Sequence, residues 1–208
     1  MSSPNANARL EMFSDGVFAI AITILVLEMK VPSLESIHSN ADIWNYLSKL
    51  WPSFFALSLS FMIILISWLG HHNLLALMDK SSTQFQLANG FFLLTVIFLP
   101  FPTAFMAEFL NTPYAQPAIF LYCLSGIFHN IGWNVFHRYL AYPVPLAKPT
   151  TNLDLLKKIR RGSQFGFIVS CAIALIAWWF PYVAIVLSFL IWVYWLILTV
   201  NAKNVEPE

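Results

Sequence analysis

The sequence predicts an all-α membrane protein, a bundle of six transmembrane helices in a single domain that spans residues 1–208. Apolar residues make up 59% of the chain and charged residues only 10%, which is more apolar than a soluble domain of this length needs to fill its core. The mean hydropathy is +0.69. The chain has 11 lysines and arginines against 10 aspartates and glutamates, so its net charge indicates neither nucleic acid nor an acidic ligand.

Six apolar segments are long enough, or nearly long enough, to cross a bilayer. A spanning helix needs about 20 mainly apolar residues, because the hydrocarbon core is roughly 30 Å thick. The segments are 12–31, 50–77, 87–109, 116–139, 163–180 and 182–200. Pro32 ends the first segment, and Pro181 makes a tight turn between the last two. The prolines and charged residues of 143–161 are expected to form the longest loop.

The distribution of lysine and arginine predicts the orientation, because positively charged short loops stay in the cytoplasm. With six spans and the N-terminus inside, nine of the eleven basic residues fall on the inner side. Only Lys30 and Lys49 then fall outside. Both termini are therefore predicted to be cytoplasmic. No small-residue cleavage site follows the first apolar run, so this run is expected to be a helix rather than a signal peptide.

The first segment is unusual because acidic residues bound it closely. Between Asp15 and Glu28 lie twelve uncharged residues, which cover only about 18 Å at helical rise. A helix surrounded by lipid would place one of these charges within reach of hydrocarbon, at a cost of about 3 kcal/mol. We therefore expect this helix to lie inside a bundle, where the charges meet protein partners or water.

A helical wheel separates an apolar stripe on this segment from its acidic residue. At about 100° per residue, an arc of roughly 100° holds four positions: Ile20, Thr23, Ile24 and Leu27. Asp15 lies about 140° from Ile20 on the same wheel. If the stripe faces a symmetry axis, it forms rings around a pore while Asp15 turns back into its own subunit. Ordinary helix packing is the competing interpretation, and periodicity alone favours it.

A motif at the start of the same segment points to a family. Arg9, Phe13, Ser14 and Asp15 form the pattern Arg-x-x-x-Phe-Ser-Asp. This pattern resembles the signature of the transmembrane protein 175 family. Members of that family are potassium-permeable channels of prokaryotes and of animal endosomes and lysosomes. Further matches in the second and third spans are Trp68, His71, Asn89 and the run Phe98 to Pro100.

The resemblance implies a six-helix unit without a pore loop, assembled as a homotetramer around an axis lined by the first helix. It places the narrowest pore position at Ile20, with further layers at Thr23, Ile24 and Leu27. It also implies a polar network that holds the first helix in place, formed by the motif residues and Trp68, His71 and Asn89. The expected permeant ion is potassium, without a cofactor, and the expected partners are membrane lipid and further copies of the chain, in a prokaryotic plasma membrane.

Potassium-over-sodium selectivity is expected to come from a hydrophobic constriction. The chain has no Thr-Val-Gly-Tyr-Gly run, and dehydration at apolar rings costs less for a larger, weakly hydrated cation. A secondary ion transporter is the alternative, although paired broken helices in two halves are missing. An enzyme is not expected, since neither His-Glu-x-x-His nor Gly-x-Ser-x-Gly is present. His129 and His137 lie too far apart on one helix to share a metal ion.

Overall fold

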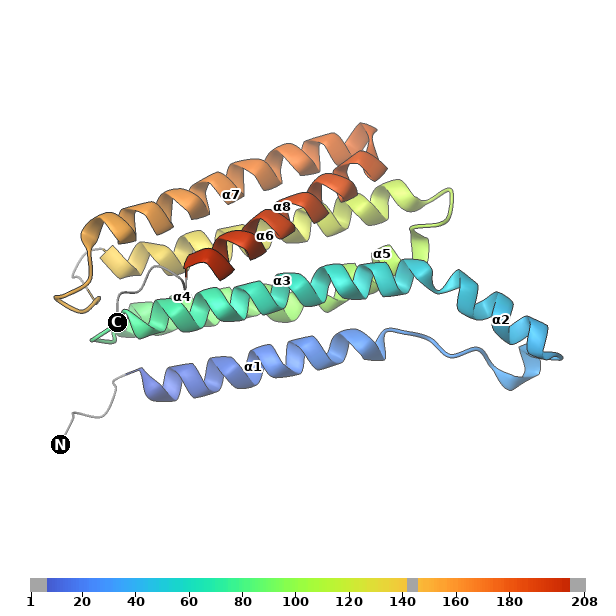
Figure 1. Cartoon of the computed structure of the whole chain (residues 1–208), viewed down its shortest axis with the longest axis horizontal. Coiled ribbons are helices and arrows are strands. Elements are labelled where there is room, and N and C mark those ends of the chain that lie inside the picture. The colour runs from blue at the N-terminus through green and yellow to red at the C-terminus, as the bar shows by residue number, and fades with distance from the viewer. Residues whose placement is uncertain (1–6, 142–145, 203–208) are drawn as a thin grey trace.

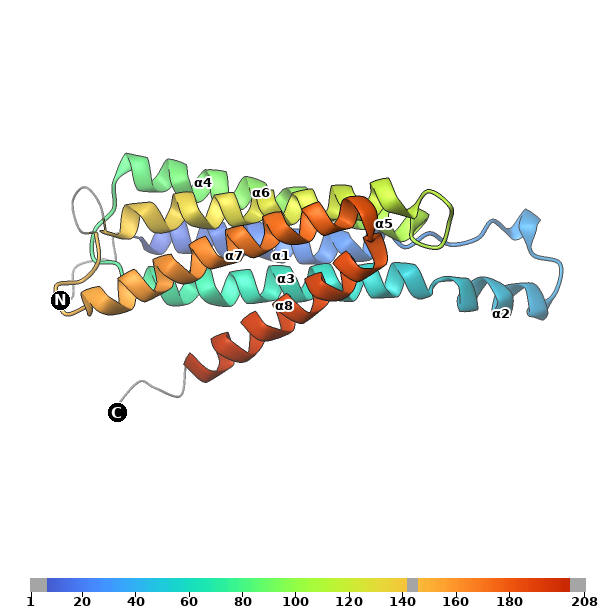
Figure 2. The ribbon, with the colours of Figure 1, turned by 90° about the horizontal axis from the view of Figure 1, so that it is seen from above.

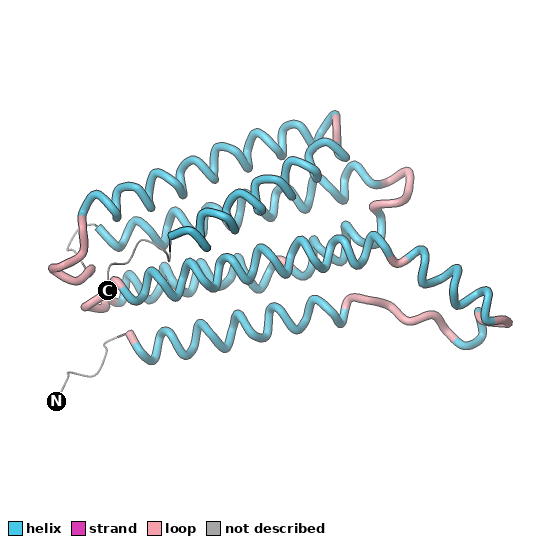
Figure 3. Tube along the Cα trace, in the orientation of Figure 1, coloured by secondary structure: helices cyan, strands magenta, loops and turns pink. Residues whose placement is uncertain are grey.

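A computed structural model describes residues 7–141 and 146–202, and this part of the chain is helical with connecting loops (Figure 3). Its elements are α1 (Ala8–Leu27), the short 3-10 turn η1 (Leu34–Ser36), α2 (Asn40–Lys49), α3 (Trp51–Ala76), α4 (Thr83–Phe98), α5 (Pro100–Phe109), α6 (Ala115–Ala141), α7 (Leu153–Trp179) and α8 (Pro181–Ala202).

Six membrane spans are formed by these helices, which confirms the predicted fold class. Each of six helical segments is long and apolar enough to cross a bilayer, and α4 and α5 together make the third, Thr83–Phe109. Pro100 has no N–H to donate to the preceding turn, so the regular helix is interrupted there. Leu99 keeps helical angles, with φ −56° and ψ −38°, and α5 therefore continues from α4 without a loop.

One prediction about the connections between spans is wrong, and one helix in a connection was not predicted. The stretch from Asp154 to Arg161 was expected in a loop, but α7 begins at Leu153 rather than at 163. The Asn152 side chain caps this helix by accepting a hydrogen bond from the Asp154 amide at 2.8 Å, and lysine and arginine are good helix formers. Helix α2 was not predicted at all, and the Ser39 hydroxyl caps it by accepting from the Asp42 amide.

The spans lie lengthwise beside one another, and α1 occupies one edge of the bundle (Figure 1). Helix α1 packs on α3, α4 and α5, whereas α6 packs on α4, α5, α7 and α8. Helix α8 crosses the others and diverges from them toward its C-terminal end (Figure 2). Ring stacking fills the centre, where His71 lies against Phe92 and Phe136 at centroid distances of 5.7 and 5.1 Å.

Helix α1 begins and α8 ends at the same end of the bundle (Figure 1). We call this the basic end, because the loops and helix termini there carry eight of the ten basic residues that the structure describes. The other two, Lys30 and Lys49, lie at the opposite end. Lys203 lies outside the described residues. The arrangement has the charge asymmetry on which the predicted orientation depends.

Candidate functional site

Helix α1 has one buried face and one exposed face. Its buried residues are Ser14, Phe18, Ala21 and Leu25. The stripe predicted from the wheel lies on the other face, with Ile20 60% exposed, Ile24 38% and Leu27 78%, and with Thr23 exposed among them. Since α1 lies at the edge of the bundle, the described part of a single chain leaves this stripe uncovered (Figure 1).

The Thr23 hydroxyl adds one polar position to the apolar stripe. It lies 2.9 Å from the Ile20 carbonyl oxygen and 3.1 Å from that of Ala19, and donates its proton to this pair of carbonyls. A hydroxyl that donates to its own helix keeps its oxygen lone pairs for other partners. The exposed face of α1 therefore presents apolar side chains together with one hydroxyl acceptor.

Asp15 is turned into its own chain, on the side of α1 away from the stripe. Its Oδ1 atom accepts a hydrogen bond from Trp68 Nε1 of α3 at 2.8 Å. One turn closer to the basic end, Glu11 Oε1 lies 3.0 Å from His72 Nδ1, also on α3. The rings of Trp68 and His72 adjoin at 6.2 Å. Both acidic side chains in the first half of α1 are therefore held by the same helix.

A second, fully buried set of hydrogen bonds joins α1, α3 and α4. Asn89 Nδ2 donates to Ser14 Oγ at 3.1 Å, and the Asn89 Oδ1 atom lies 2.7 Å from His71 Nε2. Ser14 in turn donates to the Leu10 carbonyl oxygen at 2.8 Å. Because an amide oxygen only accepts, His71 donates from Nε2. Buried polar groups are costly unless paired, so these bonds favour one position of α1 against its neighbours.

Two motif residues do not join these bonds. Arg9 is exposed, and Phe13 is 62% exposed, so neither belongs to the buried polar network of one chain. On the wheel both lie within about 20° of Ile20. Arg9 and Phe13 therefore extend the uncovered stripe toward the basic end. The family pattern did not indicate that they lie on this face.

The polar side of α6 forms a separate set of contacts between helices. His129 Nε2 lies 2.8 Å from Ser67 Oγ of α3, and His129 Nδ1 lies 3.1 Å from Thr95 Oγ1 of α4. Asn130 donates to Ser170 Oγ of α7 at 2.9 Å. Across residues 7–141 and 146–202, no three His, Cys, Asp or Glu side chains gather closely enough to hold a metal ion.

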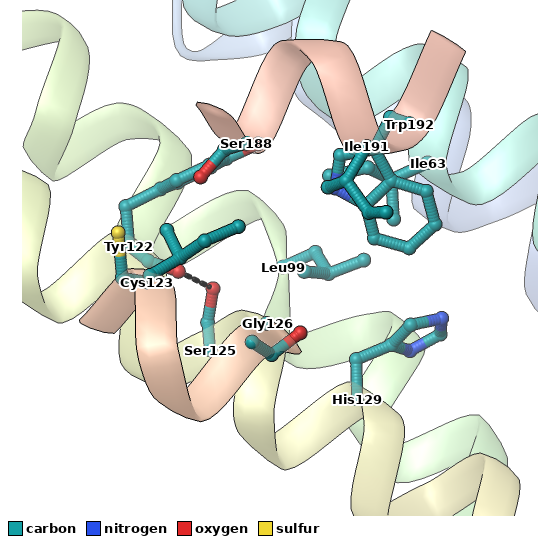
Figure 4. Close-up of a pocket in the computed structure, with 12 residues that line it drawn as sticks. Ile63, Leu99, Tyr122, Cys123, Ser125, Gly126, His129, Ser188, Ile191 and Trp192 are labelled. Carbon is teal, nitrogen blue, oxygen red and sulfur yellow. Dashed lines mark hydrogen bonds between the residues drawn. The ribbon is translucent and has the colours of Figure 1, made fainter. Parts of the chain in front are cut away.

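A small cavity inside the bundle does not offer an ion path. It has a volume of about 20 Å³ and lies among α3, α6, α7 and α8, between residues that include Ile63, His129 and Trp192 (Figure 4). This is room for about one water molecule. Ser125 on its wall donates to the Tyr122 carbonyl oxygen at 2.6 Å. The extended uncovered surface on α1 is a better candidate for the functional site than this cavity.

The segment that carries the α1 motif and its partners on α3 and α4 matches a known family. Residues 9–100 match the family described as "Endosomal/lysosomal potassium channel TMEM175". A protein of Chamaesiphon minutus, named a potassium channel, is 38% identical over 176 residues, which cover 82% of this chain and 85% of the relative. The chain belongs to the TMEM175 family.

Further comparisons of the TMEM175 chain cover nearly its whole length. A potassium channel of a Chryseobacterium species is 30% identical over 193 residues, covering 91% of this chain and 92% of the relative. The crystal structure of a lysosomal potassium-selective channel TMEM175 homolog from Chamaesiphon minutus matches with a TM-score of 0.83 at 32% identity, covering 93% of this chain and 97% of that chain. These similar proteins are ion channels and not enzymes.

Proposed function

We propose that this TMEM175 chain forms a passive, potassium-permeable cation channel that prefers potassium to sodium. The observation that carries the proposal is the exposed stripe of α1, in which Ile20 is 60% exposed although it lies in the middle of a membrane span. The names of the bacterial relatives, which are potassium channels, support the same function.

The pore of this channel requires several copies of the chain. One α1 helix at the edge of one bundle cannot enclose a path for ions, whereas a closed ring of copies surrounds an axis with identical stripes. We assign a homotetramer, as the family pattern implies, with Ile20 at the constriction and Thr23, Ile24 and Leu27 as further layers. Each layer then becomes a ring of four identical side chains.

Selectivity in this arrangement comes from dehydration. An apolar ring offers no ligands in place of the water that an ion must shed, so the barrier is lower for potassium, which holds its water less tightly than sodium does. The Asp15–Trp68 bond and the Ser14–Asn89–His71 bonds keep the stripe turned toward the axis. Their role is to position α1, and they do not touch the ion.

The chain acts in a lipid bilayer, which we assign as a prokaryotic plasma membrane with both chain termini on the cytoplasmic side. At the basic end, Lys157, Lys158 and Arg161 are exposed on the first turns of α7. Basic side chains next to a membrane span attract anionic lipid headgroups. Membrane lipid is therefore a partner of this end.

Flux measurements on purified protein in liposomes test the proposal. Downhill potassium movement with no proton or sodium gradient across the membrane is the expected result. The alternative, a secondary ion transporter, requires a second ion to move in a fixed ratio with potassium. Flux that stops whenever the proton and sodium gradients are removed supports the transporter and contradicts the channel.

A further inference from the structure

Three serines line the small cavity inside the bundle, each from a different helix. They are Ser125 of α6, Ser170 of α7 and Ser188 of α8, and the first and last of them are buried. Figure 4 shows Ser125 and Ser188 toward one end of the cavity, with His129 and Trp192 toward the other. Hydroxyl groups of three helices therefore meet around a volume of about 20 Å³.

The hydrogen bonds of these serines leave one donor and two acceptors unused. Ser125 Oγ donates to a carbonyl oxygen of its own helix at 2.6 Å, and Ser188 Oγ does the same at 2.9 Å, so both oxygens can still accept. Ser170 Oγ instead accepts from Asn130 Nδ2 at 2.9 Å. No hydrogen bond among the described residues uses the Ser170 proton, so this hydroxyl can still donate.

A water molecule matches these groups in size and in bonding. The cavity has room for about one water, and a buried water typically makes about three hydrogen bonds. Water can accept one proton from Ser170 and donate one each to Ser125 and Ser188. A potassium or sodium ion does not match, because no carboxylate is among the described residues that line the cavity, and an unpaired charge inside a membrane bundle is costly.

We propose that one water molecule binds in this cavity and joins α8 to α6 and α7. Across the described residues, α8 has one direct side-chain hydrogen bond to another part of the chain, from the Tyr182 hydroxyl to the Leu110 carbonyl oxygen at 3.2 Å. The water adds a second polar attachment at Ser188, about 9 Å farther along α8. The inference concerns a single chain, so it does not depend on the proposed assembly or on ion selectivity.

Brief X-ray irradiation of the purified full-length protein tests for the water. Radicals formed from a bound water oxidise the side chains beside it, even where bulk solvent does not reach. Tyr122 and Cys123 are buried and line the cavity, so both are expected to be oxidised, as mass spectrometry of the peptides would show. Met106 is the matched control, because it is buried away from the cavity although methionine oxidises readily. Tyr122 and Cys123 as unmodified as Met106 would overturn the proposal.

A filled cavity separates bound water from bulk solvent as the source of the radicals. Ser125→Val places methyl groups in the cavity in place of the hydroxyl, so the water is displaced and the oxidation of Cys123 should be lost. Oxidation of Cys123 that persists in Ser125→Val would show that bulk solvent reaches this site, which contradicts a bound water.

A double-mutant cycle between α7 and α8 follows the same water through stability. Ser170→Ala and Ser188→Ala are each expected to lower the unfolding temperature in detergent by about 2–4 °C, because each removes a partner of the water. The double variant should lose less than the sum, since either substitution already releases the water. Ser170→Ala with Thr199→Ala is the control and should be additive, because Thr199 bonds to its own helix away from the cavity. Full additivity of the Ser170 and Ser188 variants contradicts a shared water.

Discussion

Trp68 donates a 2.8 Å hydrogen bond to Asp15, and this bond sets which face of α1 turns away from the rest of the bundle. Asp15 lies about 140° from Ile20 around the helix, so a bond that draws Asp15 onto α3 turns Ile20 away from it. The observed exposure of Ile20, 60%, agrees with this rotation. The motif acid therefore orients the apolar stripe without belonging to it.

Asp15→Ala is expected to reduce the amount of folded, assembled protein more than it changes ion preference. The variant leaves Trp68 Nε1 unpaired, and losing a hydrogen bond to a charged group costs about 1.5–3 kcal/mol. Gel filtration and thermal unfolding in detergent measure the loss. Trp68→Phe removes the same bond from the other side, so the double variant should be little worse than either single one. Normal assembly with altered selectivity in Asp15→Ala contradicts this role.

Ile20→Asn is expected to lower potassium selectivity while raising conductance. The amide supplies polar groups that replace lost water around sodium as readily as around potassium, so the dehydration barrier falls for both ions. Reversal potentials under opposed potassium and sodium solutions measure the change.

Ile22→Asn is the control for that experiment, because Ile22 lies about 160° from Ile20 around the helix. Ile22 packs against the buried core, so the variant should yield less folded protein, yet its surviving channels should keep the parental selectivity. If Ile22→Asn abolishes selectivity and Ile20→Asn preserves it, the pore face lies on the other side of α1.

Asn89→Ala is expected to destabilise the folded chain by about 1–3 kcal/mol, because it leaves the buried groups of Ser14 and His71 without their partner. The variant removes two hydrogen bonds, of 3.1 Å to Ser14 and 2.7 Å to His71. Gln86→Ala, at an exposed position on the same helix, is the matched control and should change stability little. Equal unfolding temperatures for the two variants would show that the hydrogen bonds of Asn89 do not stabilise the folded chain.

Gly132→Ala is expected to disturb the packing of α6 on α4. An added Cβ would lie 2.8 Å from Thr95 Oγ1 and 2.9 Å from Thr95 Cγ2, closer than carbon atoms tolerate, and the Thr95 hydroxyl is already bonded to His129. The Cβ added by Gly126→Ala on the same helix meets nothing within 4 Å. Because alanine has the better helix propensity, this variant should unfold at the parental temperature or above it. Thermal unfolding of both variants decides the matter, and a Gly132 variant as stable as the Gly126 variant contradicts the packing argument.

The ion pair between Lys30 and Glu108 predicts a pH dependence at the end opposite the basic end. Their 2.9 Å hydrogen bond, followed by charge attraction, raises the pKa of Lys30 above its ordinary 10.5. A raised lysine pKa contributes stability that is fully present below the ordinary pKa and is lost as the pH rises through the folded pKa. The melting-temperature difference between parent and Lys30→Met should therefore be constant from pH 7 to 9 and shrink above about pH 10.5.

Both side chains of this pair are exposed, so salt screens the interaction and the difference is expected to be small. Glu108→Gln should show the same loss as Lys30→Met, because either substitution removes the pair. A parental advantage that already declines between pH 7 and 9 would indicate that another titrating group is responsible.

The number of spans, the apolar stripe and the separation of Asp15 from this stripe could be predicted from the sequence alone. Each depends on residues close together in the chain: length and hydropathy decide whether a segment crosses lipid, and helical periodicity decides which side chains share a face. The resemblance at Arg9, Phe13, Ser14 and Asp15 named the family for the same reason, since a local pattern can be matched without knowing the fold.

Only the tertiary structure decided which distant side chains meet. The Asn89 amide joins Ser14 to His71, which lie 75 and 18 residues away from it, and no periodicity predicts a bond across such separations. It also decided that Arg9 lies outside the polar network, that the basic segment opens α7, and that α2 stands away from the bundle. Hydropathy reports the preference of each segment for lipid, but packing and hydrogen bonding between helices depend on how the spans are placed against one another.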